Sequence, residues 1–275
     1  MRALRLPVSL LAAALVAQPA LAGDPFKPSA KDQIELGQRA AASLREEEKV
    51  LPDSDPRVQE LRKLGRLLVS LIPESEREKT GFQYTFDVID SEEVNAFALP
   101  GGPIFFYTGL LDELTTEDQV AGILAHEIVH VRKQHWASAY ADNQKRQLGI
   151  TALLLLLNAN ETAFDLASIT DAVVFSLPYS RKHERESDRI GFDMMVEANY
   201  NPQGLADVFA FLKEKGGGSG NPEWMSSHPD SSNRIKDIEK RIANSDKTFP
   251  PQKERSQLSN LMTTFNKRMR FSIIR

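Results

Sequence analysis

The sequence predicts an α+β fold that is mostly α-helical, with a small three-stranded antiparallel sheet beside one buried central helix. Three observations predict this fold. Several segments repeat apolar residues at helical spacing. Short alternating or apolar segments, typical of strands, gather between residues 82 and 107. Between the two groups, Val120–Val131 is apolar on nearly every side, so this helix belongs inside a domain.

The composition is that of an ordinary globular protein. The chain has 275 residues and a formal net charge of −4, which excludes a general affinity for nucleic acid. It contains no cysteine, so it has neither a disulfide framework nor a lipid-anchored cysteine. A metal site in this chain must therefore use histidine and carboxylate ligands.

The first 22 residues have the pattern of a signal peptide. Arg2 and Arg5 form a basic start, Val8–Val16 is an apolar run, and Ala20-Leu21-Ala22 is a small-x-small cleavage site. The apolar run is too short for the alternative, a membrane anchor. We expect export with cleavage after Ala22, most simply into a bacterial periplasm.

The expected elements follow in chain order. Helical periodicity predicts helices over residues 31–49, 58–72, 108–114, 180–199, 205–215 and 234–242. Residues 82–88 alternate strictly, and residues 94–99 and 104–107 are two further strands around a Pro-Gly-Gly-Pro turn. The chain divides into a signal peptide (1–22), one folded domain (23–248) and a basic C-terminal tail (249–275).

The central helix has a clear start. Thr116 and Gln119 have the spacing of a capping box, and the helix is expected to continue to about Gln147. On an unbroken helix, His135 would lie on a different face from His130, five residues earlier. We therefore expect His135 to be a surface or rim histidine.

Two histidines and a glutamate lie within the central helix. His126 and His130 are four residues apart, so they share one helical face, as two ligands of one Zn²⁺ must. Glu127 can reach a water on that metal as a general base. The alternative is a chance match in which a buried histidine pair forms hydrogen bonds. The apolar helix favours the metal, because buried charged groups need compensation.

A second helix supplies a candidate third ligand. Glu184 and Asp188 are four residues apart within the highly charged segment 181–189. A solvated face is the plain interpretation. The functional one makes Glu184 the third zinc ligand, with Asp188 accepting the free ring N–H of a ligand histidine.

For each of three further segments, the sequence allows two interpretations. The Leu99–Gly102 segment is either an ordinary turn or part of an edge that pairs with a substrate backbone. The apolar run Gly149–Leu157 is either a core helix or a mobile or membrane-touching cover over the active site. The basic tail is either solvated or in weak contact with a membrane or an envelope protein.

These motifs together resemble the zinc metallopeptidase family typified by HtpX, BepA and LoiP. The resemblance covers about residues 33–243. The matching segments, in order, are Asn95–Gly102, Tyr107–Leu111, His126–His130, Ser180–Gly191, Tyr200–Pro202, Ser227–Pro229 and Arg234-Ile235.

The resemblance implies a gluzincin-type fold, with zinc held by His126, His130 and Glu184 and with Glu127 as the base. Relatives sometimes use the position of Asp188 as a proton donor. We favour orientation of a histidine, because an ionised aspartate is a poor acid at neutral pH.

The resemblance also assigns two residues near the C-terminus. It implies that His228 can approach the metal as a fourth ligand and hold the enzyme latent, and that Arg234 can stabilise an oxyanion. Members of this family carry transmembrane helices, a repeat domain or a lipid-anchoring cysteine, and this sequence shows none of these features. We therefore expect a free periplasmic catalytic domain.

The expected function is zinc-dependent cleavage of peptide bonds in unfolded or misassembled envelope proteins. Such substrates would bind along an edge strand near Leu99–Gly102. Two rivals remain: a latent or non-catalytic chaperone or assembly factor that keeps the zinc fold, and a purely structural zinc site with four protein ligands.

Overall fold

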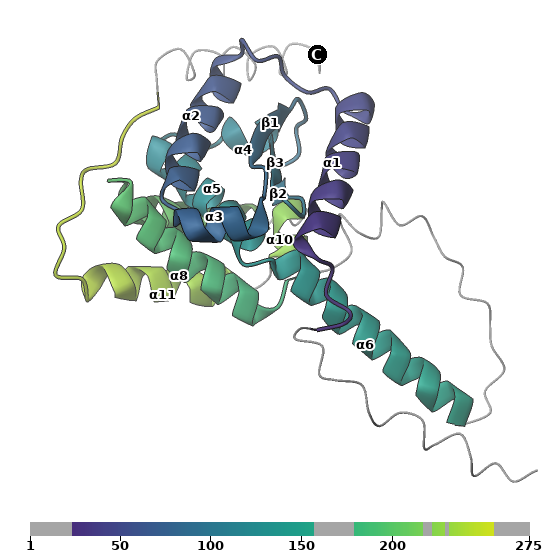
Figure 1. Cartoon of the computed structure of the whole chain (residues 1–275). Helices are drawn as coiled ribbons and strands as arrows, with labels where there is room; N and C mark the ends of the chain where they lie inside the picture. Colours follow the sequence, from purple (N-terminus) through teal and green to yellow (C-terminus); the bar gives the residue numbers. More distant parts are fainter. Residues whose placement is uncertain (1–23, 157–178, 217–221, 229–230, 256–275) are drawn as a thin grey trace, which may run out of the picture.

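The computed structural model describes residues 24–156, 179–216, 222–228 and 231–255 (Figure 1). The expected signal peptide and residues 256–275 of the expected tail lie outside this part. The elements in chain order are α1 (Ala30–Glu47), α2 (Pro56–Ser70), α3 (Glu74–Thr80), β1 (Thr85–Ile89), β2 (Ala96–Ala98), β3 (Pro103–Tyr107), α4 (Thr108–Leu111), α5 (Glu117–Arg132), α6 (His135–Leu156), α8 (Arg181–Glu197), α9 (Gln203–Gly216), α10 (Glu223–Ser227) and α11 (Ser231–Ala243).

Several helices begin at residues suited to cap them. The expected capping box of α5 is present: the Thr116 side chain accepts from the N–H of Gln119, and the Gln119 side chain accepts from the N–H of Thr116. Ser180 caps α8 in the simpler way, by accepting from the N–H of His183. The short helices α3 and α10 were not predicted.

The three strands form a mixed sheet, so the expectation of an antiparallel sheet is wrong for one of its two pairs. The strand order is β1-β3-β2, with β2 antiparallel to β3 and β1 parallel to β3. Every residue of β3 is buried, which suits a central strand. Strand β2 therefore runs in the direction opposite to both β1 and β3.

Helices cover both faces of the sheet (Figure 1). On one face, Phe86 and Phe106 belong to the main core, which also contains residues of α2 and α5. On the other face, Phe105 and Tyr107 pack in a second cluster with Ala40 and Ala41 of α1. The alternation of side chains along each strand therefore builds two cores.

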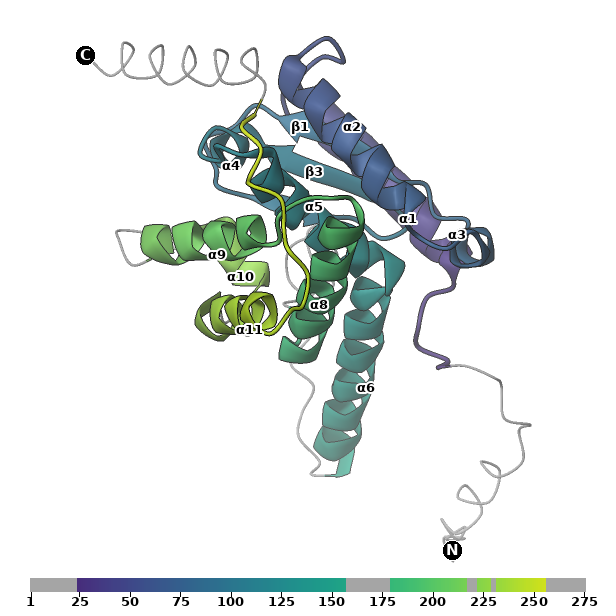
Figure 2. The same ribbon diagram turned by 90° about the vertical axis from the view of Figure 1, so that its left-hand side faces the viewer.

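The central helix α5 lies between the sheet and the C-terminal helices. Figure 2 shows α8 and α9 against its far side, with α11 beyond them. From Asp118 to Val131 nearly every residue of α5 is buried, as its apolar sequence predicts. The histidine-containing face is therefore enclosed from both sides.

The expected continuation of α5 to Gln147 is wrong. The helix ends at Arg132, and Gln134 adopts a left-handed conformation with φ 54°. A new helix, α6, starts at His135 and extends away from the body of the molecule (Figures 1 and 2). Left-handed backbone cannot continue an α-helix, so the chain changes direction there.

The turn between β2 and β3 packs tightly under α1. Gly101 has φ 78° and Gly102 has φ 136°, so both need the freedom of glycine. A Cβ on Gly37 of α1 would lie only 1.8 Å from the carbonyl oxygen of Pro100. The N-terminal helix therefore holds the end of β2 in place.

The first residues of the expected basic tail cross the start of α5. The N–H of Glu117 donates to the carbonyl of Lys253 (2.7 Å), and the N–H of Lys253 donates to Asp118 (2.5 Å). Arg255 is buried and pairs with Glu60 of α2 at 2.7 Å.

In the described part of the chain, no helix combines the length and the apolar character needed to cross a bilayer. The side chains of α6 beyond Leu148 lie outside the described part of the structure. The structure therefore does not decide between a core helix and a cover for Gly149–Leu157.

Candidate metal centre

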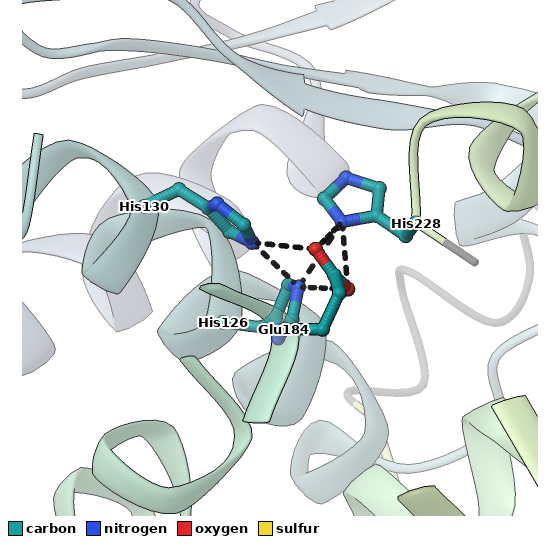
Figure 3. A group of neighbouring side chains, drawn as sticks. All are labelled: His126, His130, Glu184 and His228. Atoms are coloured by element: carbon teal, nitrogen blue, oxygen red, sulfur yellow. Dashed lines mark hydrogen bonds and ion pairs between the residues drawn. The ribbon is translucent and has the colours of Figure 1, made fainter. Parts of the chain in front are cut away.

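Two histidines and a glutamate converge in the core beneath the sheet (Figure 3). His126 and His130 point from one face of α5, and their Nε2 atoms are 2.9 Å apart. Glu184 comes from α8: its Oε2 lies 3.5 Å from Nε2 of His126, and its Oε1 lies 3.4 Å from Nε2 of His130. All three side chains are buried. The structure thus brings together the three predicted ligands.

A fourth donor completes the group. His228 follows α10, and its Nδ1 lies 3.1 Å from Oε1 of Glu184 and 3.3 Å from Nε2 of His126. One donor atom from each of the four residues lies within 4.8 Å of the others. The histidine expected as a latch is therefore inside the cluster, with its ring almost fully buried.

The donor set fits Zn²⁺. Zinc binds imidazole nitrogen at about 2.0–2.1 Å, so two ligands of a tetrahedral site lie about 3.3 Å apart. Five separations between donor atoms run from 2.9 to 3.5 Å, and all four donors lie within 4.8 Å of one another. Imidazole and carboxylate are also ligands that zinc prefers. The residues therefore suit the metal both in chemistry and in spacing.

The two α5 histidines differ in the pKa of their rings. Burial opposes a charge on His126, but hydrogen bonds to Asp188 and Glu184 raise its pKa to about 9. Burial, and then the charge of His126, hold the pKa of His130 well below its usual value. In the metal-free protein a proton on His126 therefore supplies the positive charge that the carboxylates require.

Asp188 holds the first ligand from behind. Its Oδ1 lies 3.0 Å from Nδ1 of His126, the ring nitrogen that faces away from the cluster. Burial would raise the pKa of Asp188, but the neighbouring Arg234 charge and the bond to His126 lower it. An ionised Asp188 suits the predicted role of accepting the histidine N–H, as ligand-orienting carboxylates do.

Arg234 binds the two α8 carboxylates at once. Its Nε and Nη2 donate to the two oxygens of Asp188 at 2.7 and 2.6 Å. Its Nη1 forms an ion pair with Oε2 of Glu184 at 2.7 Å, without a hydrogen bond among the described residues. The guanidinium also lies over the ring of Phe209, 4.0 Å from the centroid. Its nitrogens are thus engaged by a predicted ligand and by the residue that orients another.

Glu127 lies next to the ligands and is completely buried. Its Oε1 accepts a hydrogen bond from the indole N–H of Trp224 (3.2 Å) and lies 3.5 Å from Nε2 of His228. Its Oε2 has no hydrogen-bond partner among the described residues. A buried oxygen without a partner is costly, and it suits a group that accepts a proton during a reaction.

His135 is not the rim histidine that helical spacing predicts. It is only 2% exposed, and its Nδ1 lies 3.2 Å from Nδ1 of His130. The left-handed Gln134 breaks the helix between the two residues and places His135 behind His130. Burial lowers the pKa of His135 to about 4, so its ring is neutral at neutral pH.

Tyr179 was missed by the sequence analysis. Its ring centroid lies 3.9 Å from that of His130, and its N–H donates to the carbonyl of Ser227, next to His228. Beside it, the Leu99–Gly101 segment lines a cavity of about 10 Å³. A space of that size holds one water at most. The only sequence signal for Tyr179 is its place directly before the cap of α8.

Comparisons with known proteins show what this chain is similar to. Residues 58–242 match the model of peptidase family M48. The chain is 30% identical over 232 residues to the mitochondrial metalloendopeptidase OMA1 of Danio rerio, which covers 78% of this chain and 47% of that protein. It is 33% identical over 156 residues to OMA1 of Arabidopsis thaliana (57% of this chain, 31% of that protein).

A bacterial protease is also similar to this chain. The beta-barrel assembly-enhancing protease of Escherichia coli K12 is 28% identical over 187 residues, covering 65% of this chain and 38% of that protein. The chain thus spans half or less of the length of these relatives. The family match covers most of the chain and includes the whole ligand set. The chain belongs to peptidase family M48.

Proposed function

We propose that this protein is a zinc-dependent endopeptidase that cleaves unfolded polypeptides. The observation that supports it most is the convergence of His126, His130 and Glu184, with Glu127 beside them and one of its oxygens unpartnered in the described structure. A purely structural zinc site does not need a buried glutamate next to its ligands.

Each residue then has a distinct task. Zn²⁺ held by His126, His130 and Glu184 would supply Lewis acidity, acidifying a water molecule and polarising the peptide carbonyl. Glu127 accepts the proton of the attacking water and later delivers it to the leaving amine. Asp188 keeps His126 in the orientation that directs Nε2 into the cluster.

We assign Arg234 mainly to positioning. The expected oxyanion role needs guanidinium N–H groups that face the substrate. Its Nε and Nη2 donate to the two oxygens of Asp188. Its Nη1 lies 2.7 Å from Oε2 of Glu184 but makes no hydrogen bond among the described residues. Arg234 then balances the charge of these two carboxylates and fixes their positions, and Nη1 is the nitrogen through which it would contact an oxyanion.

The edge strand β2 is the proposed substrate site. Among the described strands it pairs only with β3, and the residues that follow it, Leu99–Gly101, line the small cavity beside His130. An extended peptide added to this edge would run beside His130, which lines the same small cavity as Leu99–Gly101. Strand pairing reads the backbone and demands little of the sequence, so unfolded segments are the fitting substrate class.

The described structure supports a latent resting state. His228 takes a fourth position among the ligands, and Tyr179 covers His130. The cavity of about 10 Å³ is too small for a peptide. We propose that the segment carrying His228 withdraws before cleavage. The same observation favours the second candidate function, a latent or non-catalytic chaperone or assembly factor.

We also propose an envelope quality-control role. The N-terminal pattern of residues 1–22 supports export to a periplasm, and the bacterial relatives are named for enhancing β-barrel assembly. Residues 256–275 add Lys267, Arg268, Arg270 and Arg275, which supports a weak contact with an anionic membrane surface or an envelope protein.

Substitution of the base tests the enzyme proposal. Glu127→Gln should retain zinc but lower the cleavage of unfolded casein about 10²–10⁴-fold, because the amide cannot accept a proton. The matched control is Glu197→Gln, an exposed glutamate at the end of α8, which should cleave at the wild-type rate. If Glu127→Gln cleaves at the wild-type rate, the assigned base is wrong. If the zinc-loaded wild-type protein cleaves nothing but prevents casein aggregation, the chaperone function replaces the enzyme.

A further inference from the structure

The second ligand histidine, His130, is supported by a third histidine rather than directly by a carboxylate. We propose that His135 is a positioning residue that holds His130 through a neutral imidazole, with Glu186 orienting His135 in turn. The inference rests on the proposed metal centre. It concerns a residue that sequence spacing had placed on another face.

The geometry of the two rings carries the first step. Nε2 of His130 faces His126 and Glu184, so Nδ1 is its remaining nitrogen. That Nδ1 lies 3.2 Å from Nδ1 of His135, and the two rings meet edge to face at 81°. A ligand histidine needs a partner for its remaining N–H, since that bond sets both the tautomer and the orientation of the ring.

The tautomers follow from proton counting. When Nε2 of His130 donates its lone pair to a metal, the ring proton lies on Nδ1 and must be donated. Nδ1 of His135 must then be the acceptor, so the proton of His135 lies on Nε2. That Nε2 is 3.4 Å from Oε2 of Glu186, which can accept it. The order is therefore His130 to His135 to Glu186, with each N–H donating to the next group.

Two further contacts keep His135 in this orientation. The hydroxyl oxygen of Ser187 lies 3.3 Å from the same Nδ1 and packs against it, while the single lone pair of that nitrogen accepts the N–H of His130. His183 stacks on the ring of His135, with centroids 4.4 Å apart and planes 13° apart. Helix α8 thus supplies Glu184 to the metal, Asp188 to His126 and Glu186 with Ser187 to His135.

Packing alone explains this arrangement less well. A buried side chain that only fills space needs no polar atoms, yet both nitrogens of His135 have partners in the described structure. The left-handed Gln134 is also required to bring the ring behind His130. Such backbone is uncommon for a non-glycine residue.

Zinc affinity is the readout that separates the two explanations. His135→Phe keeps the ring and removes the acceptor, so zinc affinity in a chelator competition should fall about 10–100-fold. His135→Asn can present an oxygen near the position of Nδ1 and should lose less than about tenfold. The matched control is His183→Phe, which keeps the ring stacked on His135 and changes no nitrogen of His135 or His130, so it should bind zinc as the wild type does.

Several outcomes overturn the proposal. Wild-type affinity in a folded His135→Phe protein would remove the positioning role, and an equal loss in His183→Phe would reduce it to packing. If the wild-type protein binds no zinc, the proposed function fails together with the inference. If the wild type binds zinc and all variants match it, only the inference fails.

A measurement on the unmodified protein covers the case in which His135→Phe does not fold. Long-range ¹H–¹⁵N correlation spectra of the zinc-loaded protein should show a neutral His135 with its proton on Nε2. They should also show a proton on Nδ1 of His130. A proton on Nδ1 of His135 would overturn the proposal, because that nitrogen could no longer accept.

Discussion

The indole N–H of Trp224 donates to the carboxylate of Glu127 at 3.2 Å, and this bond ties α10 to the proposed base. Trp224 also stacks on His228, with ring centroids 4.3 Å apart and planes 13° apart. The helix that carries His228 towards the ligands is thus attached at the same place to Glu127. Withdrawal of His228 and release of Glu127 are therefore expected to occur together.

Trp224→Phe tests this attachment. The change keeps an aromatic ring for stacking but removes the N–H, and hydrogen bonds to charged groups contribute about 1.5–3 kcal/mol. The closed form should lose part of that free energy, so casein cleavage should rise about tenfold as more molecules open. Steady-state kinetics on the zinc-loaded variant would measure it. Unchanged cleavage in a folded variant would show that this bond does not restrain α10.

His228→Ala tests the fourth position directly. Removing the imidazole should leave zinc bound by three protein ligands and raise cleavage about tenfold, because the closed state loses its contact with the cluster. Zinc content and casein cleavage should be measured together. The control is Glu197→Ala, which changes an exposed residue at the end of α8 and should leave zinc content and cleavage as in the wild type. A large loss of activity in His228→Ala would instead indicate a role in the transition state.

Arg234→Leu distinguishes positioning from oxyanion stabilisation. The change leaves Asp188 and Glu184 buried without their cation, which should lower the free energy of unfolding by about 3–5 kcal/mol. Zinc affinity should fall as well, since one of these carboxylates is a ligand and the other orients His126. Thermal unfolding and chelator competition would measure both. A variant that keeps its stability and zinc affinity but loses kcat would favour the oxyanion role.

The pH dependence of the metal-free protein follows from His126. Its pKa is raised to about 9 in the folded protein, against about 6.5 in the unfolded chain. The resulting stabilisation is fully present below pH 6.5 and is lost as pH rises to about 9, by up to about 3 kcal/mol. Urea unfolding of the metal-free protein at several pH values would measure it.

The same proton affects metal binding. Zinc must displace it below pH 9, so apparent zinc affinity should increase about tenfold per pH unit as pH rises through the neutral range. His126→Gln lacks the titrating group and serves as the control for stability. If that variant showed the same loss of stability between pH 6.5 and 9, the assignment to His126 would be incorrect.

Periodicity and capping residues predicted most helices, because the signals lie within a few residues of each other. The His126–Glu127–His130 spacing and the Glu184–Asp188 pair are also local patterns on single helices. Their meeting in one cluster was anticipated only by combining two charged motifs with a resemblance. The parallel β1–β3 pair was missed, because neither strand alone records which neighbour it will have.

By itself, the sequence determined which residues could act, since ligand spacing on a helix is set by backbone geometry over four residues. It also determined that α5 is buried, since apolar residues on every side leave no face for water. Only the tertiary structure decided that His135 supports His130, that Trp224 binds Glu127 and that Tyr179 covers the cluster. Each of these contacts joins separate elements or follows a break in the backbone. Such contacts depend on how whole helices pack, and no short stretch of sequence contains that information.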